Sequence, residues 1–305
     1  MNIEYAIIVK NKTRLEVLIE RFNTKAQAKF YIERLGGNFE DYEIENEIFQ
    51  SALQSLQLQL SKVIKNKIVE RSFVSSFIFS DNQLIIVIGQ DGLVANTAKY
   101  SKNIPIIAVN PDKARYDGVL LPFDTNNFIG GVESVISKQY NSKTMRFAEA
   151  KLNDGQRLLA FNDLFIGAST HISAKYKIKF NNTIEEQSSS GLIVSTSAGS
   201  TGWLSSIFNM SYGITNMFEK NLKPKKPKLK ENELLFAVRE PFQSIRTQIG
   251  ITAGIIKTEN NLTIESLMPA NGVIFSDGIE TDFLKFNSGS IATIGIAKET
   301  AKLVI

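Results

Sequence analysis

The sequence predicts an α/β domain followed by a β-rich domain. Continuous apolar runs at residues 84–88 and 106–109 suit strands that are covered on both faces, and they alternate with helical spacing. After about residue 145 the pattern changes to short segments in which apolar and polar residues alternate, at 157–161, 172–180, 191–195, 233–238 and 262–266. We expect an α/β domain over residues 1–147, a β-rich domain over 148–280, and a tail over 281–305, for which a return to the first domain is one possibility.

The first domain is expected to open with a strand at residues 3–9, followed by one or two helices within 12–35. A further helix is predicted over 44–64, where leucine and isoleucine recur at helical intervals and form a core-facing stripe. Strands that alternate with helices favour a parallel sheet, whose ligands lie beyond the carboxyl ends of the strands. Asp91 follows such an end.

The composition excludes several kinds of chemistry. The 305 residues are 43% hydrophobic and 22% charged, which is ordinary for a globular protein and long enough for about two domains. There is no cysteine, so disulfides, thiolate metal sites and a cysteine nucleophile are excluded. The one histidine, His171, has no Gly-x-Ser-x-Gly sequence beside it, which sets Ser-His-Asp hydrolase chemistry aside.

The net charge of +4 favours anionic ligands, and phosphorylated small molecules suit it as well as nucleic acid does. The segment 220–230 is lysine-rich and holds Pro224 and Pro227, which predicts a solvated loop between strands. No aromatic residues are interleaved with its charges, which speaks against a nucleic-acid role. No stretch approaches the ~20 apolar residues of a membrane span, and no targeting segment is visible. We therefore expect a cytoplasmic protein that binds neither nucleic acid nor membranes.

The tetrapeptide Gly89-Gln90-Asp91-Gly92 is suited to phosphate chemistry. Its glycines let backbone N–H groups approach a phosphate closely, and a helix begun within residues 93–100 would have its positive end nearby. Asp91 could act there as a base or orient a hydroxyl group. A tight Asp-Gly turn between a strand and a helix explains the same residues without any function.

Four other stretches carry polar residues in a suggestive order. They are Asn162-Asp163, Ser195-Thr-Ser-Ala-Gly-Ser-Thr-Gly-Trp203, Val109-Asn-Pro-Asp-Lys-Ala-Arg-Tyr-Asp-Gly118 and Phe275-Ser-Asp-Gly278. With the tetrapeptide, these stretches resemble the NAD kinase family through most of the chain. The hallmark of that family is Gly-Gly-Asp-Gly after an apolar strand, to which the tetrapeptide is similar. Asn162-Asp163 looks like the family's Asn-Glu motif, and the second stretch looks like its Thr-Gly-Ser-Thr nucleotide loop.

The resemblance implies an NAD kinase, with a fold related to that of diacylglycerol kinases and an active site between the two domains. Asp91 would accept the proton of the 2′-hydroxyl of the adenosine ribose of NAD, while ATP with Mg²⁺ presents its γ-phosphate. No resident metal site is predicted, and a homodimer or larger homo-oligomer is expected. The implied nucleotide-binding residues are Gly89, Gln90, Gly92, Asn162, Asp163, Thr196, Gly199, Ser200 and Thr201.

Each stretch also has a purely structural explanation. Asn162-Asp163 suits an ordinary turn, and Ser200 or Thr201 suits the cap of a helix that follows. Asp277-Gly278 suits a two-residue hairpin turn. Trp203 suits packing, with stacking on a bound ring as the alternative. The segment 286–294 is strand-like and receives no catalytic part.

The sequence departs from the family pattern beside Asp91. Gln90 replaces the second glycine, and Leu93 replaces a threonine whose hydroxyl would contact phosphate. If position 90 required a left-handed backbone, glutamine there would cost about 1 kcal/mol or more. The stretch Ser188-Ser-Ser-Gly-Leu192 also lacks the aspartate of many bacterial members, and in this the chain is more similar to the mitochondrial-type branch.

Two other functions fit parts of this pattern. One is a silent NAD(P)-binding protein in which Gln90 and Leu93 have removed the donor site. The other is a lipid kinase of the diacylglycerol or sphingosine type, which shares the glycine-framed aspartate but needs an apolar funnel for its acceptor. The sequence leaves open the phosphoryl donor, the choice between NAD and NADH, and feedback by NADP(H).

Overall fold

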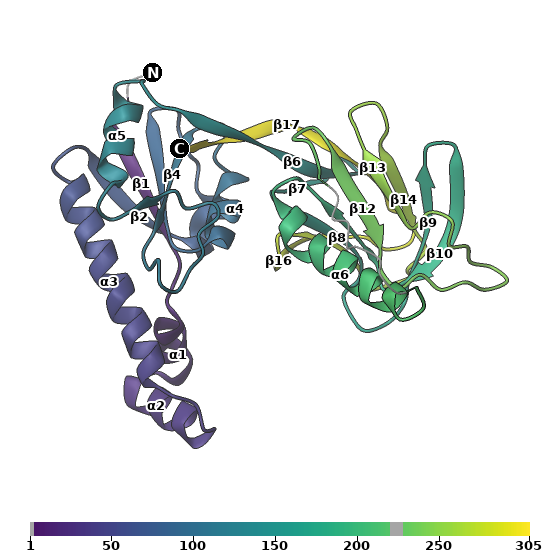
Figure 1. The fold of residues 1–305 in the computed structure, drawn as a ribbon, viewed down its shortest axis with the longest axis horizontal. Helices are drawn as coiled ribbons and strands as arrows, with labels where there is room; N and C mark the ends of the chain where they lie inside the picture. The colour runs from purple at the N-terminus through teal and green to yellow at the C-terminus, as the bar shows by residue number, and fades with distance from the viewer. Residues whose placement is uncertain (1–2, 220–227) are drawn as a thin grey trace. The chain divides into compact units, whose positions relative to one another are not determined.

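The computed structural model of the chain describes residues 3–219 and 228–305, and the chain divides into two compact units. Unit 1 consists of residues 1–144 and 301–305, and unit 2 of residues 145–300. The predicted fold class, α/β followed by a β-rich part, is confirmed (Figure 1). Most of the lysine-rich segment predicted at 220–230 lies outside the described residues.

Unit 1 is built on a parallel sheet in the order β2-β1-β3-β4. Its strands are β1 (Tyr5–Lys10), β2 (Lys65–Glu70), β3 (Gln83–Ile88) and β4 (Pro105–Asn110), with the short β5 (Phe123–Asp124) beside β4. Because all these strands run the same way, their carboxyl ends share one edge of the sheet. The register pairs Lys10 with Ile88, so the residues after β3 begin at that edge.

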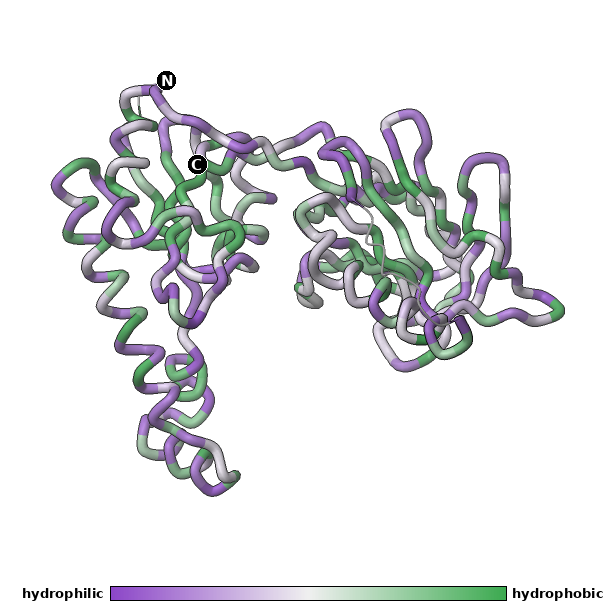
Figure 2. Tube along the Cα trace, viewed as in Figure 1, coloured by the Kyte–Doolittle hydropathy of each residue, from purple (hydrophilic) through white to green (hydrophobic). Residues whose placement is uncertain are grey.

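The core of unit 1 explains why its strands could be predicted. Every residue of β3 after Gln83 and of β4 after Pro105 is buried, and the middle of unit 1 is largely hydrophobic in Figure 2. Buried side chains of α3 (Glu40–Leu60) and α5 (Phe128–Ile136) belong to the same core. The helix predicted over 44–64 is α3, which begins and ends earlier. Among the described residues, no helix is both long and apolar enough to cross a lipid bilayer.

The segment predicted as one or two helices within 12–35 forms two, α1 (Arg14–Phe22) and α2 (Lys25–Arg34). The break lies at Asn23, whose φ of 63° is left-handed, and the side chain of Thr24 then caps α2. These helices share a small core of their own with the start of α3, formed by Leu15, Ala28 and Phe39.

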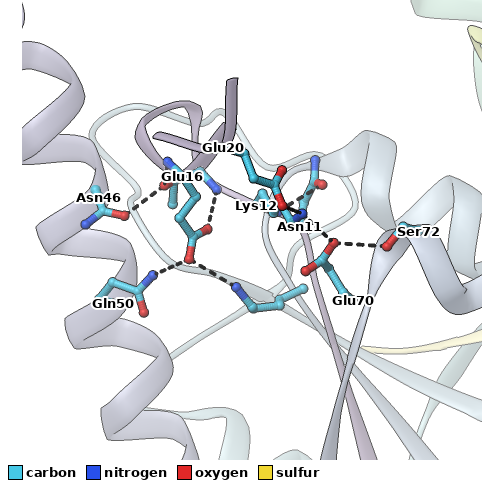
Figure 3. A network of polar contacts seen from close by, with 10 residues as sticks. Asn11, Lys12, Glu16, Glu20, Asn46, Gln50, Glu70 and Ser72 are labelled. Carbon is cyan, nitrogen blue, oxygen red and sulfur yellow. Dashed lines mark hydrogen bonds and ion pairs between the residues drawn. The ribbon is translucent and has the colours of Figure 1, made fainter. Parts of the chain in front are cut away.

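A polar network joins α1 to α3 and to the carboxyl edge of the sheet (Figure 3). The Glu16 carboxylate accepts hydrogen bonds from the Thr13 N–H at 2.7 Å, the Gln50 side chain at 3.0 Å and the Lys10 ammonium at 3.4 Å. Lys12 pairs with Glu20 and with Glu70 at the end of β2. One carboxylate therefore fixes the start of α1 against both α3 and β1.

Unit 2 contains two antiparallel sheets with a common core between them. The first has the order β10-β9-β14-β17-β6-β7, from β6 (Ser142–Leu152), β7 (Arg157–Ala160), β9 (Ala174–Phe180), β10 (Thr183–Ser189), β14 (Leu262–Ser266) and β17 (Ile291–Val304). The second has the order β13-β12-β11-β8-β15-β16, from β8 (Asp163–Ala168), β11 (Leu192–Ser195), β12 (Leu234–Val238), β13 (Ala253–Ile256), β15 (Gly272–Ser276) and β16 (Ile279–Lys285).

The strands predicted in the second half are present as β7, β9, β11, β12 and β14. The strand-like segment 286–294 is only partly a strand, because β16 ends at Lys285 and β17 begins at Ile291. A turn separates the two, in which Gly289 has a φ of 93° and the Ser290 N–H donates to the Asn287 carbonyl. The helix expected after residues 199–202 is present as α6 (Trp203–Asn216), so the lysine-rich segment comes after a helix and not after a strand.

Strand β17 takes part in both units. Its first half pairs with β14, and Lys302 and Leu303 pair in parallel with Pro105 and Ile106 of β4. The sheet of unit 1 is therefore completed by residues that follow unit 2 in the sequence.

Two leucines of α3 test the core of unit 1. Leu56 is fully buried, whereas Leu58 is 62% exposed in the same helix. Leu56→Ala is expected to lower the free energy of unfolding by about 2–5 kcal/mol, because it removes a buried side chain and leaves a cavity. Leu58→Ala should change it by less than about 0.5 kcal/mol. Urea unfolding of both variants is the measurement, and equal effects would contradict this packing.

Candidate functional site

Asp91 stands at the carboxyl end of β3, where it begins the helix α4 (Asp91–Ala98). The helix predicted after the tetrapeptide is therefore present, and Asp91 lies within its first turn. The first N–H groups of a helix have no partners inside the helix, and the helix dipole favours negative charge at this end. The position is suited to a carboxylate and to the phosphate groups of a ligand.

The Asp91 carboxylate also holds a neighbouring loop. It accepts hydrogen bonds from the Leu120 N–H at 2.8 Å and the Val119 N–H at 3.2 Å. Asn110, at the end of β4, organises the same loop, since its side chain donates to the Tyr116 carbonyl and accepts from the Asp112 N–H. The loop that contains the stretch 109–118 is thus tied to the tetrapeptide, because Val119 and Leu120, which follow the stretch, contact Asp91.

The backbone strain considered for Gln90 is absent. Gln90 has φ −100° and ψ 164°, an extended conformation that any residue adopts. Its side chain is exposed, whereas Leu93 is buried. Leu93 packs against Gly89, because a Cβ on that glycine would lie 3.0 Å from the Leu93 Cδ2. Gly89 therefore makes room for Leu93, and the unusual residues fit the local structure.

In unit 2, the Asp277 carboxylate organises the second group of residues. It accepts hydrogen bonds from the N–H groups of Phe161, Asn162 and Asp163, at 3.1, 2.6 and 3.3 Å. Its own N–H donates to the Asp163 carbonyl at 2.9 Å. The predicted hairpin turn is confirmed, because Asp277 and Gly278 join β15 to β16 with φ values of 54° and 70°. The sequence suggested the turn but not this role of the side chain.

The nucleotide-loop stretch folds onto Asn162 and Asp163. A Cβ on Gly199 would lie 2.3 Å from the Asn162 carbonyl oxygen and 2.8 Å from the Asp163 Oδ1, so only glycine fits there. Thr196 joins the two segments further, because its hydroxyl donates to the Phe161 carbonyl and accepts from the Gly199 N–H. Two stretches that the sequence predicted separately therefore form one cluster.

The capping prediction for Ser200 and Thr201 is wrong. Residues Gly199–Thr201 form a short 3-10 turn, and α6 begins after Gly202, with no side-chain cap. The Ser200 hydroxyl donates instead to the Ser197 carbonyl at 2.7 Å. Thr201 is exposed. The turn leaves both hydroxyl groups outside the helix.

Asp163 is the perturbed titratable group of this cluster. Burial raises the pKa of its carboxyl to about 7, the nearby Asp277 carboxylate adds to the rise, and a hydrogen bond with Ser195 opposes it. Within the described part of the chain, its Oδ1 is buried without a hydrogen-bond partner. A protonated Asp163 can donate a hydrogen bond, which an ionised carboxylate cannot.

The predicted site residues thus fall into two groups. Gly89, Gln90, Asp91 and Gly92 lie together in unit 1, and Asn162, Asp163, Thr196, Gly199, Ser200 and Thr201 lie together in unit 2. In the described residues, no group of three or more histidine, aspartate or glutamate side chains is arranged to hold a metal ion.

Comparison with known proteins finds similarity between this chain and kinases of NAD and NADH. No protein-family model matches the chain. It is 24% identical over 121 residues to an NAD kinase of Chlorobaculum tepidum and 29% identical over 123 residues to one of Chlorobium phaeobacteroides. Each alignment covers 39% of this chain and 42% of the relative, so the match spans about two fifths of those relatives' length.

Two solved structures match nearly the whole chain. Yeast NADH kinase in complex with NADH has a TM-score of 0.59 and 14% identity, covering 100% of this chain and 84% of its own. An NAD kinase from Archaeoglobus fulgidus in complex with ATP has a TM-score of 0.55 and 16% identity, covering 99% and 93%. This likeness shows that the chain has the fold of NAD and NADH kinases.

The raised pKa of Asp163 predicts a pH dependence of stability. The folded chain keeps this proton up to about pH 7, whereas an unperturbed carboxyl loses it near 3.8. Between those values the unfolded chain binds fewer protons, so the carboxyl's contribution to stability falls as pH rises. We therefore expect the unfolding free energy of the wild type, minus that of Asp163→Asn, to decrease as the pH rises from about 4.5 to about 7.5.

Urea unfolding at the two pH values measures this difference. Asp154→Asn is the control, because a backbone hydrogen bond from Gln156 lowers the pKa of that exposed carboxyl, and no such fall is expected. A difference for Asp163→Asn that is the same at both pH values would contradict the burial of this carboxyl.

The close approach of Gly199 predicts a cost for any side chain there. Gly199→Ala should lower the free energy of unfolding by roughly 1–3 kcal/mol, since the neighbour at 2.3 Å is backbone and cannot turn away. Gly213 in α6 is the matched control, with nothing within 4 Å of its added Cβ. Gly213→Ala should raise stability by about 0.5–1 kcal/mol, as expected in a helix. A stable Gly199→Ala variant would contradict the cluster.

Proposed function

We propose that the chain is an NAD kinase, which transfers the γ-phosphoryl group of ATP to the 2′-hydroxyl of the adenosine ribose of NAD and forms NADP. The observation that carries the proposal is the packing of Gly199 onto Asn162 and Asp163. It joins the two stretches that resemble the family's NAD-binding motifs, in a chain with the fold of NAD and NADH kinases.

Asp91 is the proposed base. Its two backbone contacts fix the orientation of the carboxylate, and each carboxylate oxygen has about two acceptor positions, so one on each stays available. A fixed acceptor at the carboxyl end of a parallel strand can align a ribose hydroxyl group and take its proton. The backbone N–H groups of Gln90 and Gly92 would hold the phosphates of the donor, whereas the Gly89 N–H already donates to the Val109 carbonyl at 3.2 Å.

The cluster in unit 2 is the proposed NAD-binding part. The Asn162 amide and the hydroxyl groups of Ser200 and Thr201 can recognise ribose hydroxyls and the amino group of adenine. Asp163 adds a carboxyl group that can donate or accept a hydrogen bond according to pH. Thr196 already uses its hydroxyl within the cluster, so we assign it the positioning of Gly199 against Asn162.

The reaction balances with these groups alone. As the ribose oxygen attacks the γ-phosphorus, its proton passes to the Asp91 carboxylate, and the bond between the γ-phosphorus and the β,γ-bridging oxygen breaks to release ADP. Mg²⁺ enters with ATP as part of the substrate and neutralises charge on the phosphates. The protein positions the reactants and supplies the base.

Other expectations accompany this proposal. They are a cytoplasmic location, a homodimer or larger homo-oligomer, and a place in the mitochondrial-type branch, which the absence of the aspartate before Leu192 supports. The choice of phosphoryl donor, and the choice between NAD and NADH as acceptor, depend on contacts with the bound substrates.

A silent NAD(P)-binding protein is the second candidate. The specific observation in its favour is that Asp91 has a structural use in the described chain, as the acceptor for the Val119–Leu120 backbone. That use explains why an aspartate stands there even without catalysis, and Gln90 and Leu93 would then mark the loss of the donor site.

An Asp91→Asn variant separates these functions. It keeps the shape of the side chain and removes the base, so NADP formation from NAD and Mg-ATP should fall about 10²-fold or more. NAD binding, measured by calorimetry, should stay near that of the wild type. Asp117→Asn is the control, because this exposed aspartate lies in the neighbouring loop, and its turnover should be unchanged.

Unchanged turnover in Asp91→Asn would remove the catalytic assignment. A wild-type chain that binds NAD and forms no NADP would favour the silent binding protein.

A further inference from the structure

Glu45 of α3 is the only charged residue that is buried among the residues the structure describes, with 8% of its surface exposed. A buried carboxylate is stable only where charged or polar partners compensate for the water it has lost. The proposed function uses no residue of α3. The burial of this charge therefore calls for an explanation of its own.

Two guanidinium groups share one oxygen of the Glu45 carboxylate. Arg14, the first residue of α1, contacts the Glu45 Oε2 through its Nε at 2.5 Å and through its Nη2. Arg115, in the loop that follows β4, donates to the same oxygen from its Nη1 at 3.2 Å. Glu45 therefore joins the start of α1 to that loop across the end of α3.

The loop over residues 111–120 has no apolar anchor of its own, since none of these residues is buried. Asp112 shapes it locally, because its carboxylate accepts from the Ala114 N–H at 3.1 Å and pairs with Arg115 at 3.5 Å. A segment with few buried contacts opens easily unless polar contacts hold it. Arg115 supplies such a contact from the loop to α3.

On the other side of this contact, Glu45 belongs to a helix that the core of unit 1 fixes. Buried side chains in its later turns, such as Leu56, pack in that core. Beside Glu45, the Asn46 side chain accepts from the Thr13 hydroxyl at 2.8 Å, which ties this end of α3 to the start of α1 (Figure 3). Glu45 can therefore hold Arg115 at a fixed place relative to the sheet.

The loop carries this position on to Asp91. Val119 and Leu120, whose N–H groups donate to the Asp91 carboxylate, follow Arg115 by four and five residues. Gly118 lies between them with a left-handed φ of 64°, and its carbonyl closes a hydrogen-bonded turn at 3.0 Å. A displacement of Arg115 would therefore move the two donors that orient the carboxylate.

We propose that Glu45 is a positioning residue of the proposed kinase site. Glu45 holds Arg115, Arg115 holds the loop, and the loop orients the Asp91 carboxylate toward the ribose hydroxyl group. This inference rests on the proposed function, and it gives the α1–α3 part of unit 1 an indirect role in the reaction.

Glu45→Gln removes the charge and keeps the size of the side chain. The kcat of NADP formation should fall about tenfold, because a misplaced reacting group loses much of its effect, whereas KM for NAD should change less than about twofold. Arg115→Gln should have the same effect, and Arg115→Lys, which keeps the charge, should retain most of the turnover. Glu43→Gln is the matched control, since this carboxylate of α3 pairs with Lys25 at 2.5 Å, and its kcat should be unchanged.

Double variants separate positioning of Asp91 from a merely structural role. In an Asp91→Asn chain, Glu45→Gln should cause no further loss of turnover, because its effect passes through the Asp91 carboxylate. The variant with both Glu45→Gln and Arg115→Gln should lose no more than either change alone. A loss that multiplies with that of Asp91→Asn, or a wild-type kcat in both Glu45→Gln and Arg115→Gln, would overturn the proposal.

Amide hydrogen exchange, followed by NMR, tests the same contacts without turnover. The N–H groups of Val119 and Leu120 should exchange about tenfold faster in Glu45→Gln and in Arg115→Gln, and at the wild-type rate in Glu43→Gln. A wild type that forms no NADP would remove the proposed function, and faster exchange would then still support the hold of Glu45 on the loop. Unchanged exchange in both variants would overturn it. Arg115 is an exposed loop residue, so its variant tests the proposal even if Glu45→Gln fails to fold.

Discussion

The predicted nucleotide-binding part of unit 2 depends on one carboxylate. Asp277 accepts from the N–H groups of Phe161, Asn162 and Asp163, which fixes the start of β8, while its own N–H fixes the turn against the same strand. Only with that backbone held in place can Gly199 approach the Asn162 carbonyl so closely. The position of the loop that follows β11 is therefore decided by a residue on a distant hairpin, and the hydroxyl groups of that loop are placed through it.

The elements that could be predicted from the sequence are those that depend on residues close to one another in the chain. β3 and β4 are recognised from continuous apolar runs because they are buried on both faces. The helix α5 was not predicted, since Gly130 and Gly131 interrupt an apolar stretch that has no polar face to reveal a helix. The role of Asp277 was also beyond prediction, because its contacts reach residues up to 116 positions away. A turn-forming Asp-Gly pair shows where the chain reverses and gives no sign of where the carboxylate points.

Aspartate side chains serve two purposes in this chain, and the backbone groups around them decide which. The Asp277 carboxylate accepts from N–H donors, as does that of Asp91, and these contacts hold the backbone around both side chains. Asp163 is buried beside Asp277 with an oxygen that the described residues leave without a donor, which favours its neutral form. Two neighbouring carboxyl groups thereby differ in their hydrogen-bond partners. A carboxylate that holds the backbone lies beside a carboxyl group whose pKa is raised.

Strand β17 has a consequence for the order in which the chain acquires its structure. The sheet of unit 1 pairs β4 with Lys302 and Leu303, so one of its partners is synthesised only after the whole of unit 2. Pairing between such distant segments is slow, since the entropy of closing a long loop is lost before the contact forms. During synthesis, the backbone groups of β4 that pair with β17 stay unpaired until β17 has been made, and they can pair with other strands in the meantime. Unit 2 can complete its own sheets first, and the closing of the earlier unit is then the last event.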